Sequence, residues 1–373
     1  MAGIYLHIPF CKQACHYCDF HFSISARHRG PMVEAILQEL AMRTDYLGSA
    51  PVETIYFGGG TPSVLATAEI ERLLEAVYAH YTVIDTPEIT LEANPDDLTR
   101  AKLDELAATR INRLSIGIQS FSEADLRYMN RAHNAAEAAQ CVAWAQAAGF
   151  DNLTIDLIYG SPTTSHAQWA ENLARTAALG VPHVSSYCLT VEEGTALANF
   201  VARGQARPVD DEHAATQFDM LLEWATREGY DHYEISNFAR PGRYARHNTN
   251  YWHGVPYLGV GPSAHSFDGT SRQWNVAHNA KYIKALSSAE LPAEREALTP
   301  DDRYNEYVLT SLRTMWGSER ARLLQFGSKY AAHFEQQLQS YLKSGHAEPT
   351  PTGYRLTQSG KLLADRIAGD LFV

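Results

Sequence analysis

The chain has 373 residues, of which 45% are hydrophobic, so it is long enough for two or three domains with ordinary cores. Its formal net charge of −12 disfavours a protein that coats nucleic acid or lies flat on an anionic membrane. Five cysteines are too few for a disulfide framework, and the sequence has neither a signal pattern nor a run of ~20 apolar residues. We therefore expect a cytoplasmic globular protein.

The first two-thirds of the sequence alternate apolar strand patterns with amphipathic helix patterns. One helix pattern places Ile70, Leu73, Leu74 and Val77 on a single face. Strands are expected at residues 4–8, 54–57, 88–91, 113–118, 153–158 and 183–189. Repeated strand–helix units predict a parallel sheet with right-handed crossovers. Six units are too few for a closed eight-unit barrel, so the prediction is an α/β fold shaped as a partial, open barrel.

Composition predicts three segments along the chain. Residues 1–235 are expected to form the partial barrel. Residues 236–290, rich in Gly, Pro, Asn, His and Tyr, are expected to be a loop-rich connection, and the uncharged stretch 247–267 reads as loop. Residues 291–373 are expected to form a small, mainly helical domain that is winged-helix-like, because Tyr354–Leu356 reads as a short strand before a closing helix. The acidic balance of the chain disfavours DNA binding by this domain.

Three of the five cysteines are clustered. Cys11, Cys15 and Cys18 have the spacing C-x3-C-x2-C, and clustered thiols in a reducing compartment are better read as metal ligands than as disulfides. A zinc site completed by His16 or His21 is one alternative. An iron–sulfur cubane is the other, and three thiolates would leave its fourth iron open to a substrate.

The other two cysteines have a simpler reading. Cys141 lies in an alanine-rich helix pattern, and Cys188 lies near the end of an apolar strand pattern. We expect both to be thiols that pack in the core.

The cysteine spacing, with Tyr17 before the last cysteine, resembles the signature of the radical S-adenosylmethionine (SAM) superfamily. Its place directly after the first predicted strand agrees, since barrel enzymes carry their chemistry at the C-terminal ends of strands. The resemblance implies that SAM chelates the open iron through its amino and carboxylate groups. It also implies that an electron from the cluster cleaves the sulfonium to give a 5′-deoxyadenosyl radical.

Polar groups recur at the ends of the following predicted strands. Gly58–Thr61 follows the second strand, and glycines let a backbone approach a ligand and leave its N–H and C=O groups free. Glu92 and Gln119 end the next two strands, and Asp156 lies inside an apolar strand, where a carboxylate is costly unless paired. Arg131 is a candidate cation for a carboxylate. Each has a plainer reading as a turn, a surface group or a structural ion pair, but together they suit a ligand held over an open barrel.

The run Tyr5-x-His7-Ile8-Pro9-Phe10-Cys11, together with these strand-end residues, resembles the coproporphyrinogen III dehydrogenase-like family of radical SAM proteins. The resemblance covers nearly the whole chain. It implies a [4Fe–4S] cluster on Cys11, Cys15 and Cys18, and SAM contacts at Tyr5, Tyr17, Gly59, Gly60, Thr61, Glu92, Gln119, Arg131 and Asp156.

Two features separate the branches of that family. The dehydrogenase branch has a further cysteine two residues after the third, where this chain has Phe20. The run His247–Trp252 resembles the H-N-x-x-Y-W motif of the heme chaperone (HemW) branch. Histidine is the usual axial donor to heme, so His247 is the candidate heme ligand. The plainer alternative is that His247 only hydrogen-bonds a loop over the barrel.

The sequence thus predicts a SAM-binding [4Fe–4S] heme chaperone that delivers heme to an apoprotein, such as a respiratory cytochrome. The alternatives are an oxygen-independent coproporphyrinogen III dehydrogenase and a zinc-stabilised binding module, so enzymatic activity stays open. By resemblance, SAM cleavage would need an electron donor such as a flavodoxin or ferredoxin. A transient membrane-associated partner and a homodimer are possible, and no nucleic acid is expected.

Overall fold

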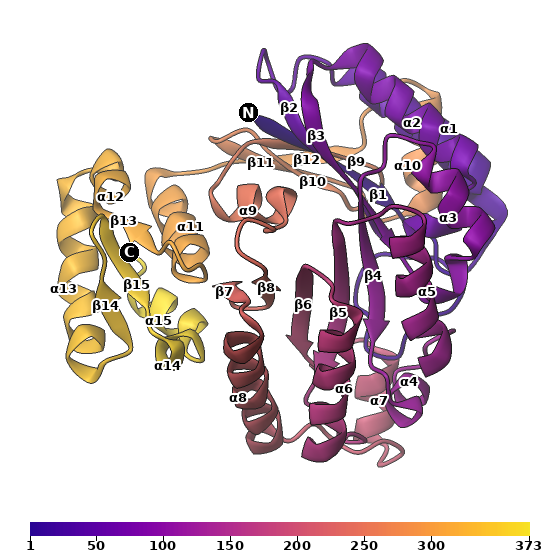
Figure 1. The fold of residues 1–373 in the computed structure, drawn as a ribbon. Helices are drawn as coiled ribbons and strands as arrows, with labels where there is room; N and C mark the ends of the chain where they lie inside the picture. Colours follow the sequence, from indigo (N-terminus) through magenta and orange to yellow (C-terminus); the bar gives the residue numbers. More distant parts are fainter.

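Six parallel strands form the centre of a large open sheet. The computed structural model describes residues 1–373. The strands neighbour one another in chain order: β1 (Ala2–Ile8), β2 (Val52–Gly59), β3 (Val83–Ala93), β4 (Arg113–Gln119), β5 (Leu153–Tyr159) and β6 (His183–Cys188). Every neighbouring pair is parallel. The six predicted strands and the open barrel are therefore confirmed (Figure 1).

The crossover helices cover the outer, convex face of this sheet (Figure 1). They are α1 (Arg29–Met42), α2 (Thr67–His80), α3 (Arg100–Ala107), α4 (Glu123–Tyr128), α5 (Ala135–Ala147) and α6 (His166–Leu179), with α7 (Ala196–Ala202) and α8 (Asp211–Glu228) after β6. The short helices η1 (Ala26–His28), η2 (Pro62–Val64) and η3 (Pro95–Asp97) lie in connections. Ile70, Leu73, Leu74 and Val77 are fully buried, as their spacing on α2 predicts. Apolar helix faces thus pack one side of the sheet, which leaves its concave side for polar groups.

The expectation of a loop-rich segment after residue 235 is wrong. β7 (Asp231–Glu234) and β8 (Asn237–Ala239) extend the sheet antiparallel beyond β6. At the other edge β9 (Tyr257–Val260) pairs parallel with β1, followed by antiparallel β10 (His265–Phe267), β11 (Ser271–Asn275) and β12 (Ala293–Ala297). α9 (Arg246–Trp252) and α10 (Asn279–Ser287) belong to the same segment. Strands of three to five residues are too short for the sequence to show their alternation.

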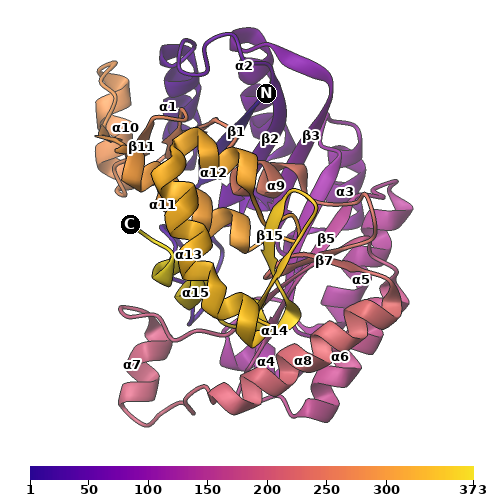
Figure 2. The same cartoon turned by 90° about the vertical axis from the view of Figure 1, so that its left-hand side faces the viewer.

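The C-terminal residues form a lobe with a separate core. Its elements are α11 (Pro300–Leu312), β13 (Ser318–Glu319), α12 (Arg320–Phe326), α13 (Ser328–Ser344), β14 (Ala347–Pro349), β15 (Gly353–Leu356), α14 (Gln358–Lys361) and α15 (Ala364–Asp370). Fourteen buried residues, from Tyr304 to Leu371, make up this core. The boundary at residue 291 stays a prediction, and β12 pairs with β11 of the large sheet. Figures 1 and 2 place the lobe beside the open side of the large sheet, next to α9.

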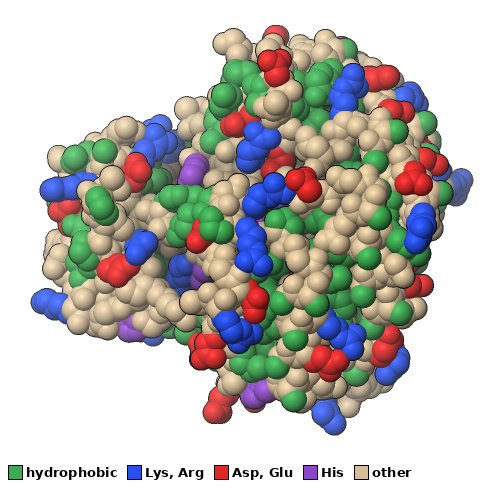
Figure 3. Space-filling view, in the orientation of Figure 1, with side chains coloured by type: hydrophobic (Ala, Val, Ile, Leu, Met, Phe, Trp, Pro, Cys, Tyr) green, Lys and Arg blue, Asp and Glu red, His purple; other side chains and the backbone are tan.

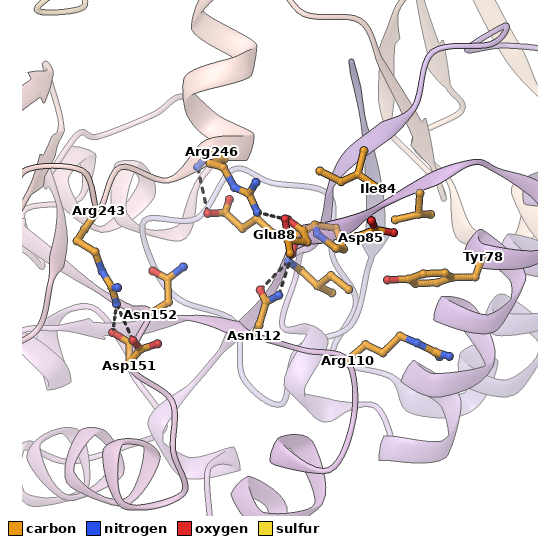
Figure 4. Close-up of a pocket in the computed structure, with 14 residues that line it drawn as sticks. Tyr78, Ile84, Asp85, Glu88, Arg110, Asn112, Asp151, Asn152, Arg243 and Arg246 are labelled. Carbon is orange, nitrogen blue, oxygen red and sulfur yellow. Dashed lines mark hydrogen bonds and ion pairs between the residues drawn. The ribbon is translucent and has the colours of Figure 1, made fainter.

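The N-terminal ends of the central strands hold a buried polar network. Glu88 of β3 accepts the backbone N–H groups of Arg246 (3.1 Å) and His247 (3.0 Å), the first two residues of α9. Arg113 of β4 lies 3.8 Å from the Glu88 carboxylate and is 2% exposed. Figure 4 shows Glu88 and Arg246 at a polar cavity of about 780 Å³ beside these strand ends. Glu88 therefore fixes where α9 begins.

None of the helices is long and apolar enough to cross a membrane.

Replacing Glu88 with alanine tests this anchor. The change leaves the buried Arg113 without its partner and α9 without its N-terminal acceptor. We expect the free energy of unfolding to fall by about 3–5 kcal/mol, the usual result of breaking a buried pair. Asp85→Ala, at an exposed carboxylate of the same strand, should change it by less than ~0.5 kcal/mol. Equal urea midpoints for the two variants would contradict the anchoring role.

Candidate functional site

The three clustered cysteines lie in the loop that leaves the C-terminal end of β1. Cys11, Cys15 and Cys18 are half-buried free thiols. The loop is held to its surroundings at several points: the Cys11 N–H donates to Ser23 O (3.0 Å), and the Gln13 side chain donates to Asn130 O (2.9 Å). The cysteines thus sit on a braced loop at the end of the sheet where the other strand-end residues emerge.

Two of the thiols receive hydrogen bonds. Thr61 Oγ1 donates to Cys11 Sγ (3.4 Å), and Arg131 Nη1 donates to Cys15 Sγ (3.1 Å). Burial raises the pKa of Cys11, and it raises the pKa of Cys18 to about 11. The Cys11 and Cys18 thiols therefore hold their protons at neutral pH, and a metal would have to displace those protons. Hydrogen bonds to sulfur are among the factors that set the reduction potential of an iron–sulfur cluster.

The two histidines considered for a zinc site have other partners. His16 Nδ1 lies 2.9 Å from Tyr128 O, and His21 Nε2 lies 2.7 Å from Asn279 Oδ1. No group of three His, Cys, Asp or Glu side chains converges on a position for a single metal ion. The three cysteines are not grouped around such a position either, so zinc stays an alternative to the cluster.

The glycine loop after β2 packs closely against β1. A Cβ on Gly59, whose φ is 107°, would lie 2.7 Å from the His7 ring, and one on Gly60 would lie 2.7 Å from Phe10 O. The Gly60 N–H donates to Ile8 O (2.9 Å) and the Thr61 N–H to Phe10 O (2.7 Å). The expectation that the N–H groups of this loop are free for a ligand is therefore wrong for Gly60 and Thr61, because the end of β1 takes both.

Two carboxylates lie in the lumen, on the concave side of the sheet, without a salt bridge. Burial raises the pKa of Glu92 to about 7, with Tyr56 Oη donating to its carboxylate (2.7 Å). Burial likewise raises the pKa of Asp156 to about 6, against the lowering effect of Arg113 and Arg131. The negative charge of Asp156 also raises the pKa of Glu92 across the lumen. A half-buried acid with a raised pKa gains most from a ligand that brings hydrogen-bond donors or positive charge.

Arg131 and Gln119 lie beside these acids. The Arg131 guanidinium donates to Cys15 Sγ, Asn94 Oδ1 (2.7 Å) and Gly117 O (2.8 Å), and its buried Nε–H has no partner. Gln119 ends β4 with a φ of 67°, the left-handed region that a non-glycine residue rarely adopts. Such strain at a strand end is typical of a binding position.

His247 faces the same lumen from its opposite end. Its Nδ1 lies 2.8 Å from Thr54 Oγ1, and its ring centroid lies 5.0 Å from that of Tyr56 and 6.4 Å from that of Tyr5. Burial lowers the pKa of His247 to about 3, so its imidazole is neutral. His7 is also neutral, with its pKa lowered by burial to about 4 and its Nε2 3.0 Å from His21 O.

The structure brings most of the predicted site residues together. Glu92, Asp156 and Arg131 influence one another or the thiols electrostatically, and Tyr17 is half-buried near Arg131. Tyr5 lies closer to the other end of the lumen, where its ring stacks with those of Tyr56 and His247. Cys141 packs in the core as predicted. The same prediction is wrong for Cys188, which is half-buried beside Gly160 and outside the core clusters.

Sequence reasoning missed four residues of the lumen: Thr54, Tyr56, Glu88 and Arg113. Strand alternation is the signal that could have found them. Thr54 and Tyr56 precede Gly58 at steps of two, and Glu88 lies four residues before Glu92.

Comparison with known proteins gives the family. The radical SAM superfamily model matches residues 5–176. The chain is 35% identical over 374 residues to a heme chaperone HemW from Mycobacterium tuberculosis, covering 99% of this chain and 94% of that protein. It is 30% identical over 372 residues to HemW from Escherichia coli, covering 98% of this chain and 96% of that protein. The chain belongs to the HemW family of radical SAM proteins.

A HemW relative from Bacillus subtilis is 31% identical over 375 residues, covering 99% of this chain and 98% of that protein. The solved structure of coproporphyrinogen III oxidase (HemN) from Escherichia coli matches with a TM-score of 0.86 at 24% identity, over 100% of this chain and 90% of that chain. This second likeness concerns the fold. Membership in a HemW family of radical SAM proteins implies SAM and a [4Fe–4S] cluster. The cysteine thiols suit the cluster, and the unpaired lumen acids with the free Arg131 Nε–H suit the amino and carboxylate groups of SAM.

The raised pKa of Glu92 predicts a pH-dependent stability in the protein without cluster or SAM. Between its ordinary value of 4.5 and about 7, folded Glu92 keeps a proton that the unfolded chain has lost. The stability that this proton gives is therefore lost as pH rises through that window. The free energy of unfolding of Glu92→Gln minus that of the wild type should therefore increase by about 3 kcal/mol between pH 4.5 and 7.5.

The measurement is the difference between the two unfolding free energies at each pH. Buried neutral histidines such as His7 and His247 oppose the trend, since they destabilise the fold as pH falls, but they cancel in the difference. Glu71→Gln, on the exposed face of α2, should give a flat difference. A flat difference for Glu92→Gln would show that its carboxyl titrates normally.

Proposed function

We propose that this chain is a SAM-binding [4Fe–4S] heme chaperone that binds heme and passes it to an apoprotein. The observation that carries the proposal is full-length similarity to proteins named heme chaperone HemW, with the H-N-x-x-Y-W motif kept at His247–Trp252. Phe20, 68% exposed in the cysteine loop, stands where the dehydrogenase branch has a cysteine. A respiratory cytochrome is one such recipient, and a membrane-associated partner and a homodimer belong to the same proposal.

The cofactor site is assigned residue by residue. Cys11, Cys15 and Cys18 bind the cluster, which supplies an electron to the sulfonium of SAM when both are bound. The carbonyl oxygens of Gly59 and Gly60 accept from the SAM amino group, since the Gly60 N–H is taken by Ile8 O. Arg131 donates to the SAM carboxylate through the N–H that has no protein partner. The further SAM contacts are Tyr5, Tyr17, Thr61, Glu92, Gln119 and Asp156.

Neighbouring residues of the lumen position the side chains that are assigned to SAM. Tyr56 orients the Glu92 carboxylate, and Asn94 with Gly117 O fixes the Arg131 guanidinium. Because the two acids are half-buried, a donor from SAM binds them more strongly than it would at the open surface. A flavodoxin or ferredoxin would supply the electron if SAM is cleaved.

Anaerobic reconstitution tests the cluster and the cargo together. Iron and sulfide should give a brown protein with about four irons, as the cubane requires, and hemin should then shift the Soret band. Cys18→Ser should lose most of the iron, whereas Cys141→Ser, in the core, should keep it. Turnover of coproporphyrinogen III with SAM and a reductant would overturn the chaperone assignment in favour of the dehydrogenase. Persistent zinc without sulfide uptake would overturn both.

A charge-removing change at Arg131 tests the SAM assignment. Arg131→Gln should weaken SAM binding at least about tenfold, because a hydrogen bond to a charged group contributes about 1.5–3 kcal/mol. The measurement is calorimetric titration of SAM into reconstituted protein with matched iron content. Arg127→Gln, at an exposed arginine of α4, is the control and should bind SAM like the wild type. Equal affinities for both variants would remove Arg131 from the site.

A further inference from the structure

A second cavity, of about 410 Å³, lies where the C-terminal lobe meets the large sheet. α9 and the strands after it form one wall, and α11 with α12 forms the other. Five aromatic side chains line it: Tyr251, Tyr257, Phe267, Tyr307 and Phe326. Its volume lies within the range of small-molecule sites, and its apolar walls suit a flat aromatic ligand.

The cavity is basic although the chain is acidic. Arg272, Arg303 and Arg322 line it with one carboxylate, Glu306, which pairs with Arg272 (2.8 Å). Neither Arg303 nor Arg322 takes part in an ion pair, and the buried Arg303 Nε–H has no hydrogen-bond partner. Figure 3 shows basic and histidine side chains gathered at the junction of the two lobes. Arg303, with its unpartnered Nε–H, and the exposed Arg322, which donates to Gln325 Oε1 (2.7 Å), both carry a positive charge without an ion pair. Two such guanidinium groups beside aromatic walls suit a planar ligand with two carboxylates.

A histidine with free ring nitrogens also lines the cavity. His253 follows the last residue of α9, and neither ring nitrogen has a hydrogen-bond partner. Its ring meets Trp316 edge-on at 4.8 Å between centroids. His247 lies six residues earlier, roughly 240° around the helix, and its Nδ1 is taken by Thr54. The two histidines therefore cannot serve the same ligand, and His253 is the one that faces unpaired arginines.

We propose that this cavity is the heme site, with His253 as the axial donor to iron and with Arg303 and Arg322 binding the two propionates. The inference rests on the proposed function and specifies where its cargo binds. Tyr251, which is 40% exposed, shows that the cavity opens to solvent, so one edge of the porphyrin stays accessible for transfer. His247 instead holds the floor of the barrel lumen.

Hemin titration followed at the Soret band tests the axial donor. His253→Ala should lose the wild-type ferric coordination spectrum and bind hemin at least tenfold more weakly. His247→Ala should keep that spectrum, and His265→Ala, at an exposed histidine outside the cavity, is the matched control. Circular dichroism and iron content show whether each variant is folded. Loss of the coordination spectrum in folded His247→Ala, with His253→Ala unchanged, would overturn the assignment.

The propionate contacts need a separate comparison, between hemin and hemin dimethyl ester, which lacks the two charges. Wild type should prefer hemin at least tenfold, and the double variant Arg303→Gln/Arg322→Gln should lose that preference. Arg320→Gln, at an exposed arginine paired with Glu335 outside the cavity, should keep it. If the wild type binds hemin and the double variant shows the same preference for hemin over its ester, the proposed site is overturned while the chaperone proposal stands. Wild type that binds no hemin overturns the chaperone proposal itself.

Discussion

The burial of charged groups inside an open barrel is the constraint on which the rest of the structure depends. At the N-terminal ends of the strands the charges are matched within the chain: Glu88 faces Arg113, which also donates to Thr154. Thr154 in turn meets His183, whose other ring nitrogen lies 2.7 Å from Tyr233 Oη. Most polar groups of this floor have partners within the chain, which stabilises the fold, and the Arg113 Nε–H is left with the Glu88 carboxylate at 3.8 Å and no hydrogen bond.

Towards the cysteine loop the same lumen is incompletely matched. Glu92 and Asp156 have no ion pair, and the Arg131 Nε–H has no acceptor. A protein that buries such groups carries a desolvation cost in its folded state. A ligand with complementary charges lowers that cost, and this gain adds to its affinity. At the N-terminal ends of the strands the charges are paired, and that part of the sheet acts as a scaffold. Near the cysteine loop the charges lack ion pairs, and that part of the same sheet acts as a binding site.

Much of this architecture could be predicted from the sequence because it rests on local patterns. Long apolar strands, the α2 stripe and the spacing of Cys11, Cys15 and Cys18 are all visible within short windows. β9 to β12 could not be predicted because each strand is short and is stabilised by its neighbours in the sheet. Likewise, no window that contains Gly60 reveals that its N–H is taken by Ile8, fifty residues away in sequence.

The contacts between distant segments also explain what the H-N-x-x-Y-W motif does as a unit. α9 has seven residues, so its two ends lie about 10 Å apart. His247 at its start faces the lumen, while Tyr251 near its end and His253 just after it line the cavity at the C-terminal lobe. One helix thus borders both the SAM lumen and the basic aromatic cavity. Because Glu88 holds the first N–H groups of α9, the same buried carboxylate that belongs to the floor also sets the position of the side chains in the cavity.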